Sequence, residues 1–439
     1  MARVVTTHRK ARQTVGVRER IVNVAEGLAV GSGSVLRNRT VLGISLASLL
    51  SDAGHEMATA ALPGFLRSIG APAAALGAIE GIADGSMSAA KVAGGVVADR
   101  PGVERRAVAS GGYAVVALGH ASFALANAWP AVAVSRAVSW IARGGKNPSR
   151  DSLLAGSVDR ADLGKAIGLE RGMDSVGAVI GPLLAAPVLL AVGYRWLFAV
   201  SLLPGLGAAL AVLLLVRSAP RLAAARPVWQ GSMRTLVSAP GPFRRLLAGI
   251  GLFGLGNFSS TLLILRAAEL LSRHGRSNVQ AAAIAVLLYA GLNAANALVA
   301  YPAGAIADRV GRRPVIVAGI FAFGAACTVF AFGSANIAVL AALFAVVGAS
   351  TGMVETAQSA YAAELVEDHL RGRAFGLLGL VEGIGDLVSS VAVGVLFTVS
   401  APAWAFAFGA AAATAGAIVM LAPDRRTQDP RIGASTPAI

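Results

Sequence analysis

The sequence predicts an all-α membrane protein whose twelve transmembrane helices form two pseudo-symmetric six-helix bundles. Three observations predict this class. The 439 residues are 56% hydrophobic and only 14% charged, whereas soluble domains contain about 25% charged residues. Twelve apolar segments are long enough to cross a bilayer, which requires ~20 residues of helix. The second half of the chain also repeats charged and glycine positions of the first half.

The twelve predicted spans are separated by short connections, apart from one long basic linker. The segments show no alternation of period two and are too long for barrel strands, so helices are favoured over an outer-membrane barrel. The spans are expected at residues 41–62, 72–98, 107–128, 130–152, 165–192, 194–216, 246–268, 278–306, 314–333, 335–360, 373–399 and 402–422.

The same pattern predicts the domain organisation. We expect an N-terminal tail at 1–40, a first bundle at 41–216, a basic linker at 217–245, a second bundle at 246–422 and a C-terminal tail at 423–439.

The basic residues outside the spans lie mostly on one side of the predicted topology. Lysine and arginine concentrate in cytoplasmic segments of membrane proteins, so both termini are predicted to be cytoplasmic and the chain to cross the cytoplasmic (inner) membrane several times. The net charge of +15 is then explained by basic loops that face anionic lipid headgroups. Nucleic-acid binding is not needed to explain it.

An internal repeat supports the two bundles. Residues 164–181 and 372–389 share glycines and an acidic position at a constant offset, and residues 95–102 and 304–311 match at nearly the same offset. Duplicated membrane proteins bind their substrate near the bilayer midplane, between the two repeats. We therefore expect a substrate site between the halves.

A charged loop motif occurs once in each half. The second copy runs Gly304-x-x-x-Asp308-Arg309-x-Gly311-Arg312-Arg313-Pro314, and the first runs Gly95-x-x-x-Asp99-Arg100-x-Gly102. The first copy departs after Gly102, where one residue is inserted and Glu104 adds an acid. Glycine permits the tight turn that each short connection requires, and the acidic residues could serve only as turn residues and helix caps.

This doubled loop in a duplicated twelve-span chain is similar to the signature of the major facilitator superfamily, over about 41–422. The resemblance implies a monomeric transporter without a cofactor, whose two bundles rock about a central cavity. It also implies a conformational latch, for which the candidates are Gly95, Asp99, Arg100, Gly102, Arg150, Gly304, Asp308, Arg309, Gly311 and Arg312. Arg150 and Asp151 are expected to bond the loop at Asp99.

Ionisable residues inside the spans point to a functional site, because charges at bilayer depth are unfavourable unless they are paired or face water. Two acidic pairs are spaced four residues apart, and four cations of the span at 130–152 share one helix face. Two nearby carboxylates cannot both be ionised easily in a low dielectric. The candidates for proton coupling are therefore Asp52, Glu56, Glu80, Asp84 and Arg136, and the alternative is a static salt-bridge network.

Further polar residues inside the spans are candidates for the substrate cavity: Arg143, Lys146, Asp174, Asn257, Asn293, Asn296, Glu382 and Asp386. The cationic stripe favours an anionic solute and the acidic pairs favour a cation, so the charge of the substrate stays open. His55, between Asp52 and Glu56, could bind a metal ion or simply be a hydrogen-bonded histidine. His120 is expected to be a packing or interface residue on a lipid-facing span.

The predicted function is secondary transport. No phosphate-binding G-x-x-x-x-G-K-[ST] loop is present, so an ATP-driven pump is disfavoured, and no catalytic residue set of an enzyme is found. We expect a proton-coupled antiporter that exports a small organic or drug-like compound. The alternatives are a transporter of a metal ion, metal complex or oxyanion, and a non-transporting receptor or assembly protein of the same fold.

Overall fold

The computed structural model describes residues 35–100, 102–159, 162–217, 241–366, 371–399 and 402–422. Residues 1–34 of the predicted N-terminal tail (1–40), the predicted C-terminal tail at 423–439 and most of the predicted linker lie outside these residues. Within the described ranges the regular elements are helices, in agreement with the predicted all-α class.

The first half contains five α-helices and one short 3-10 helix. These are α2 (Arg39–Ser68), α3 (Ala73–Asp99), α4 (Arg105–Ala121), η1 (Ser122–Leu125), α5 (Trp129–Ala155) and α6 (Leu163–Leu215). Helix α6 contains two spans, because Gly193 breaks its helical path with φ 79°. Only glycine adopts such an angle readily. The first half therefore supplies six spans.

The second half repeats this arrangement with one interrupted span. Its helices are α8 (Gly241–Gly254), α9 (Ser260–Arg273), α10 (Asn278–Val310), α11 (Arg312–Phe332), α12 (Ile337–Glu364), α13 (Arg371–Val399) and α14 (Pro402–Leu421). Helices α8 and α9 together occupy one predicted span, and Ser259 caps α9 by accepting a hydrogen bond from the Thr261 amide. The prediction of twelve helices is confirmed.

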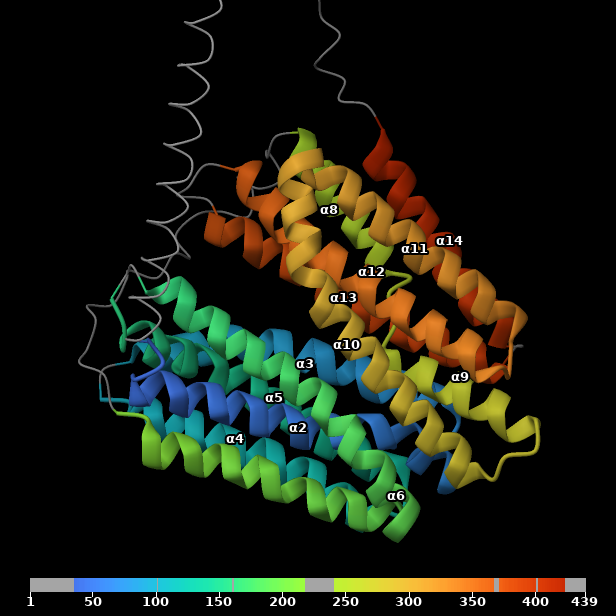
Figure 1. The fold of residues 1–439 in the computed structure, drawn as a ribbon, viewed down its shortest axis with the longest axis horizontal. Coiled ribbons are helices and arrows are strands. Elements are labelled where there is room, and N and C mark those ends of the chain that lie inside the picture. The colour runs from blue at the N-terminus through green and yellow to red at the C-terminus, as the bar shows by residue number, and fades with distance from the viewer. Residues whose placement is uncertain are drawn as a thin grey trace, which may run out of the picture.

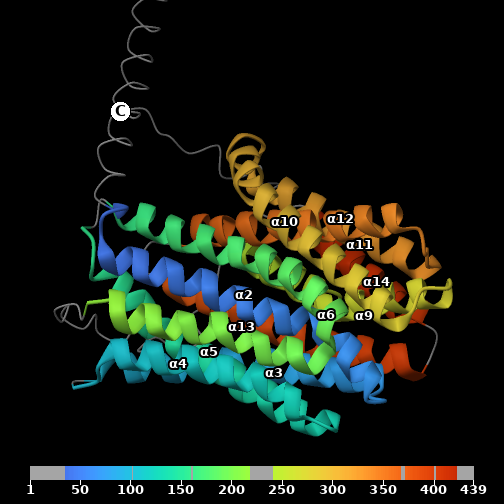
Figure 2. The same cartoon turned by 60° about the horizontal axis from the view of Figure 1, so that its bottom comes forward.

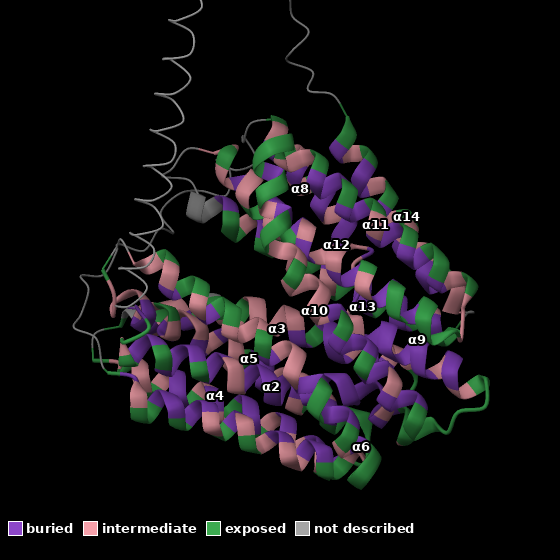
Figure 3. Cartoon of the chain, in the orientation of Figure 1, coloured by how far each residue is buried: buried purple, intermediate pink, exposed green. Residues whose placement is uncertain are grey.

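The apolar helices and the charge-bearing helices are different ones. Among the described residues, seven helices are long and apolar enough to cross a membrane on that ground alone. The others are the short α8 and α9 and the helices α2, α3 and α5, which hold most of the predicted intramembrane charges. Figure 3 shows the buried residues gathered inside each half and where the halves meet. Charged side chains of these helices, such as Asp52, Glu80 and Arg136, are therefore surrounded by other protein groups.

The two halves meet mainly through α3 with α13 and through α6 with α10. We call the end with Asn38 and Ala422 the tail end, and the end with Gly70 and Gly275 the far end. In Figures 1 and 2 the halves converge toward the far end, and in Figure 1 they diverge toward the tail end. At the far end the Ala74 amide donates a hydrogen bond of 2.8 Å to Thr398 Oγ1.

Close approach of α3 and α13 depends on small residues. A Cβ placed on Gly77 would collide with the Ser390 carbonyl oxygen and would lie 3.0 Å from the Gly394 Cα. Backbone atoms of a packed helix cannot move aside individually, so a side chain at this position has to separate the two helices.

We expect Gly77→Ala to open the far end. Overpacking costs about 1–3 kcal/mol, which lowers the population of the closed far end at least about fivefold. Disulfide formation between cysteines introduced at Ala74 and Thr398, in a Cys327→Ser background, measures this population. Gly376→Ala on α13 is the control, because open space surrounds Gly376. Unchanged crosslinking in Gly77→Ala would contradict the prediction.

Candidate functional site

A polar cavity of about 410 Å³ lies among α2 to α6 of the first half. It is within the volume range of small-molecule sites, ~300–1,000 Å³. Its walls carry more cationic than carboxylate side chains. The lining residues are Ser48, Ser51, Asp52, Met87, Lys91, Tyr113, Arg143, Lys146, Asn147, Pro148, Arg150, Asp151, Arg171 and Asp174.

Two arginines of α5 are paired with carboxylates in this cavity. Arg143 Nη2 lies 2.9 Å from Asp52 Oδ1 on α2. Arg150 lies 2.8 Å from Glu170 on α6 and 2.9 Å from Asp151. The sequence places both arginines on one face of α5, and this face meets α2 and α6 in the structure. Arg150, expected to bond the loop at Asp99, is instead held between α2 and α6.

Lys146 lies between these two arginines on α5 and is 4% exposed. Its Nζ lies 3.8 Å from the centroid of the Tyr113 ring and 3.2 Å from Asn147 Oδ1. Among the residues that the structure describes, no carboxylate comes within 4.0 Å of this ammonium group. Asp174, across the cavity on α6, likewise forms no ion pair within the described part of the chain.

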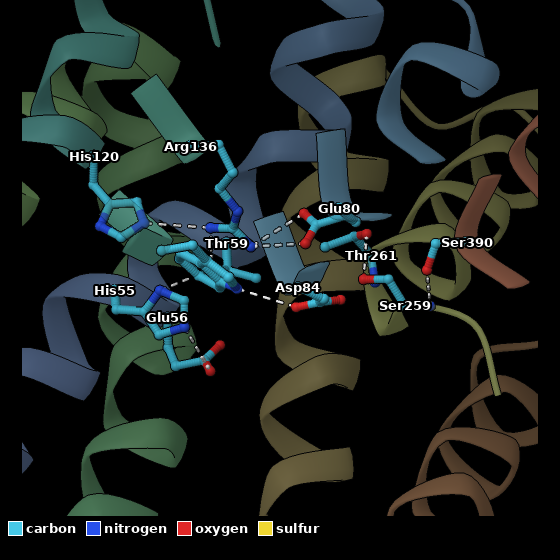
Figure 4. Close-up of polar contacts among 11 residues, drawn as sticks. His55, Glu56, Thr59, Glu80, Asp84, His120, Arg136, Ser259, Thr261 and Ser390 are labelled. Atoms are coloured by element: carbon cyan, nitrogen blue, oxygen red, sulfur yellow. Dashed lines mark hydrogen bonds and ion pairs between the residues drawn. The ribbon is translucent and has the colours of Figure 1, made fainter. Parts of the chain in front are cut away.

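A second polar network lies farther toward the far end, within the first half (Figure 4). Arg136 of α5 is 1% exposed, and its Nη2 donates to both carboxylate oxygens of Glu80 on α3, at 3.0 and 3.1 Å. Its Nη1 donates to Thr59 Oγ1 at 3.0 Å and lies 3.3 Å from His120 Nε2. Charge-assisted bonds of this kind are among the strongest in proteins. The network fixes α2, α3, α4 and α5 together.

Trp140 joins Asp84 to this network. The guanidinium carbon of Arg136 lies 3.8 Å from the Trp140 ring centroid, an arrangement that attracts the cation to the ring face. Trp140 Nε1 donates to Asp84 Oδ1 at 3.1 Å. Asp84 lies one helical turn beyond Glu80 on α3 (Figure 4). Glu56 lies one helical turn beyond Asp52 on α2.

His55 has the surroundings of a hydrogen-bonded aromatic residue. Its Nδ1 lies 3.3 Å from Thr59 Oγ1, and its Nε2 lies 3.5 Å from Glu56 Oε1. Its ring packs against His120 and Trp140, with centroids 5.1 and 4.6 Å away. Within the described ranges, no group of three or more histidine, cysteine, aspartate or glutamate side chains is arranged to hold a metal ion.

The cavity candidates of the second half lie elsewhere. Asn293 Nδ2 on α10 donates to the Ala178 carbonyl of α6 at 2.9 Å, across the two halves. Asn296 Nδ2 donates to Thr351 at 3.0 Å. Three further candidates, Asn257, Glu382 and Asp386, also lie outside the cavity lining. The backbone carbonyl of Asn257 accepts a hydrogen bond from Ser389, and the Glu382 carboxylate accepts one from Gln358. Asp386 follows Glu382 by one turn on α13. The structure thus brings only Arg143, Lys146 and Asp174 of the predicted cavity set to this cavity.

The two loop motifs form tight turns at the tail end. Gly102 and Gly311 have φ of 88° and 95°, which explains glycine at both positions. In the second copy, Arg312 lies 3.3 Å from Asp308 and 2.6 Å from Glu364 of α12. Gly304 lies one helical turn before Asp308 on α10.

The first copy differs in its contacts. Arg105 Nε caps α3 by donating to the Ala98 carbonyl at 3.0 Å. Gly95 has open space around it, and Arg100 is exposed, as is Arg309 in the second copy. The side chain of Asp99 lies outside the residues that the structure describes.

Several contributors to the site were missed from the sequence. Ser48, Thr59 and Tyr113 are uncharged, and serine, threonine and tyrosine also occur in other spans, so no pattern distinguishes these three. His120, predicted to be a packing or interface residue, packs against Trp140 and is 2% exposed. The sequence did not predict its contact with Arg136. Ionisable residues are rare within spans, so the presence of a histidine in this span was the signal that could have marked His120 as a site residue.

Comparisons with known proteins identify the family of the chain. The sequence model described as Major Facilitator Superfamily matches residues 44–295 and again 258–438. The chain belongs to the major facilitator superfamily. Members of this superfamily are secondary transporters and not enzymes, so the chain is a multi-pass transporter of a small solute.

Two relatives of this superfamily protein are described only in general terms. An uncharacterized MFS-type transporter of Methanocaldococcus jannaschii is 24% identical over 385 residues, which is 88% of this chain and 94% of the relative. An uncharacterized protein of Mycobacterium tuberculosis is 31% identical over 376 residues, 84% of this chain and 88% of the relative. Neither name indicates a substrate.

Solved structures establish the superfamily fold. The nucleoside transporter NupG matches with a TM-score of 0.73 at 14% identity, over 87% of this chain and 98% of that chain. A bacterial homolog of the human lysosomal transporter Spinster, in an inward-facing and unoccupied conformation, matches with a TM-score of 0.66 at 16% identity, over 88% and 95%. At these identities the similarity defines the fold alone.

Proposed function

We propose that the chain is a proton-coupled secondary transporter in which Asp52 carries the proton. The observation that carries this proposal is the Asp52–Arg143 pair, because both side chains line the cavity. A carboxylate at a water-filled cavity can exchange a proton with the solvent, and its arginine partner responds to the change of charge. The state of Asp52 would thereby be coupled to whatever occupies the cavity.

Glu80 is less suited to this role in the present conformation. It lies outside the cavity lining and is held by two hydrogen bonds from the buried Arg136. Protonation of Glu80 would leave the charge of Arg136, which is 1% exposed, buried without a counter-charge, and this is strongly unfavourable. We therefore assign Arg136 and Glu80 to the scaffold and Asp52, followed by Glu56, to proton transfer.

The cation distribution orients the proposed transporter. Because arginine and lysine concentrate on the cytoplasmic side, the tail end with its two basic loops is assigned to the cytoplasm. On this assignment the halves are joined on the outer side and diverge toward the cytoplasm. Alternating access would require the contacts of α3 with α13 to open and the loop motifs to close. Export remains the direction predicted from the sequence.

We expect Asp52→Asn to abolish solute-driven proton movement. The purified protein is reconstituted into liposomes that contain the pH indicator pyranine, and gradients of glutarate, cadaverine or arsenate are applied in turn. Asparagine cannot bind or release a proton, so the variant should reduce the proton flux at least about 100-fold, within the range contributed by a positioned acid or base. Exchange of labelled for unlabelled solute should persist.

Glu104→Gln is the matched control, because Glu104 lies outside the cavity lining, is half exposed and pairs only with Arg106 among the described residues. This variant should retain the wild-type proton flux. Full proton flux in Asp52→Asn would contradict the assignment of Asp52. Absence of solute-dependent flux in the wild-type protein with all three solutes would count against proton-coupled transport.

A further inference from the structure

The charges of the cavity are not balanced by its own ion pairs. Asp52 is paired with Arg143, and Arg150 is paired both with Asp151 of the lining and with Glu170 outside it. With Asp174 included, five cations of the lining stand against four carboxylates. Three cations of the lining then have no close carboxylate within the lining, namely Lys91, Lys146 and Arg171. Arg171 lies 3.9 Å from Glu170, which is outside the lining. Only Asp174 remains on the acidic side. The paired cavity therefore keeps a surplus of positive charge, and such a surplus raises the local concentration of anions.

Lys146 concentrates this surplus at a buried point. Its ammonium group has three donors, whereas the structure provides one amide acceptor, Asn147, and the face of the Tyr113 ring. A buried cation is unfavourable unless it is paired. No carboxylate among the described residues lies within 4.0 Å, so an anionic group that enters the cavity would supply a close counter-charge for this ammonium group.

A second unpartnered donor belongs to the neighbouring turn. Arg143 uses Nη2 for Asp52, whereas its Nη1 is buried and has no hydrogen-bond partner. Arg143 and Lys146 are three residues apart on α5, so their side chains lie on the same face of the helix. A guanidinium edge and an ammonium group on one face form a suitable binding site for the two oxygens of an oxyanion.

From these observations we propose that the cavity binds a small anionic solute, through a carboxylate or another oxyanion group held by Lys146 and the guanidinium group of Arg143, two residues that line the cavity. This inference rests on the proposed transport function and names its substrate class. A volume of about 410 Å³ suits a small polar anion, and Lys91 and Arg171 can contact a second acidic group of the same solute.

Anion binding also bears on the direction of coupling. An anion beside Arg143 competes with the carboxylate of Asp52 for the same cation, so anion binding favours the protonated form of Asp52. By reciprocity, a protonated Asp52 favours anion binding. Proton and anion would then cross the membrane together. This outcome differs from the antiport predicted from the sequence.

A set of three probes of equal length tests the substrate class. Glutarate, its neutral diamide glutaramide and the diamine cadaverine have five-carbon chains and differ in charge. Thermal unfolding of the full-length protein in detergent, measured against the concentration of each probe, gives the binding constant. Glutarate should stabilise the protein, and glutaramide and cadaverine should bind at least about tenfold more weakly. Tighter binding of cadaverine would overturn the proposal in favour of a cation site at Asp174.

Variants of Lys146 tie the effect to this cavity. Lys146→Gln should weaken glutarate binding at least about tenfold, whereas Lys146→Arg, which keeps the charge, should retain most of it. Lys165→Gln is the control, because Lys165 lies outside the cavity and pairs with Asp162. Equal glutarate binding in the wild-type protein and Lys146→Gln would overturn the site. Inorganic phosphate distinguishes a general oxyanion site, which binds it, from one that requires an organic anion.

The sign of proton movement tests the coupling separately. With pyranine inside the liposomes, an inward glutarate gradient should acidify the lumen, whereas antiport would make it more alkaline. Glutarate binding without proton movement would leave the substrate class intact and contradict the proposed proton coupling. Proton movement driven by cadaverine and not by glutarate would support proton-coupled transport and overturn the anion proposal.

Discussion

Replacing Arg136 by methionine is expected to lower the free energy of unfolding by about 3–5 kcal/mol, which is the range for removal of one partner from a buried ion pair. Arg136 is the largest of the fully buried side chains, and four neighbours contact its guanidinium group. Methionine fills part of the space but leaves the Glu80 carboxylate buried without a counter-charge. The variant should lose transport because α2, α3 and α5 lose their common anchor.

Thermal unfolding of the purified variant in detergent measures this effect. Adding Glu80→Gln to Arg136→Met removes the uncompensated charge, so the double variant should recover at least about half of the lost stability. Arg106→Met is the matched control, since Arg106 pairs with Glu104 near the surface, and exposed pairs contribute only about 0–1 kcal/mol. A small loss in Arg136→Met, similar to that of the control, would show that the network does not anchor the bundle.

Gly177→Ala should disrupt the packing of α2, although one methyl group is the only change. A Cβ on Gly177 would collide with the Leu49 carbonyl oxygen. One turn farther along α6, a Cβ on Gly181 would lie only 2.6 Å from the Ala53 carbonyl oxygen. Asp52 lies between these two carbonyls on α2. Overpacking costs about 1–3 kcal/mol, and a displacement of about 1 Å at a positioned group can reduce a rate about 100-fold.

The control for this variant is the same substitution five residues earlier. Open space surrounds Gly172 on the same helix, where alanine should stabilise the helix by up to about 1 kcal/mol because it has the higher helix propensity. In thermal unfolding, Gly177→Ala should therefore lower the stability and Gly172→Ala should raise it. In liposomes, Gly177→Ala should reduce solute exchange far more than Gly172→Ala does. Similar behaviour of the two variants would show that α2 and α6 tolerate a wider separation.

Much of the architecture follows from the sequence. In hydrocarbon every backbone polar group must be bonded within the protein, so each long apolar segment becomes a helix. The span predicted at 194–216 is found, although it is fused to the preceding span at Gly193. The span predicted at 246–268 is also found, although it is interrupted between α8 and α9. The repeated loop motif predicted the duplicated fold. The helical period by itself places Arg136, Arg143 and Lys146 on one face of α5.

The candidate site was predictable only in part. The sequence identified Asp52, Glu80, Arg136 and Arg143 as buried ionisable residues, because charges within spans are rare. It could not place the cavity in the first half, where the second-half candidates such as Asn296 take no part in its lining. Helix tilt and the close approach at glycines decide which side chains face a common space, and these depend on neighbours distant in sequence.

By itself, the sequence determined that this protein is a duplicated bundle of twelve helices with charges on its inner helices, since the bilayer imposes helices and excludes unpaired charge. Only the tertiary structure decided the pairing, in which Arg136 meets Glu80, Arg143 meets Asp52 and Lys146 keeps no carboxylate within the described part of the chain. The reason is geometric. Every one of these ionisable groups could attract several others, and the rotation and height of each helix decide which of them come within reach.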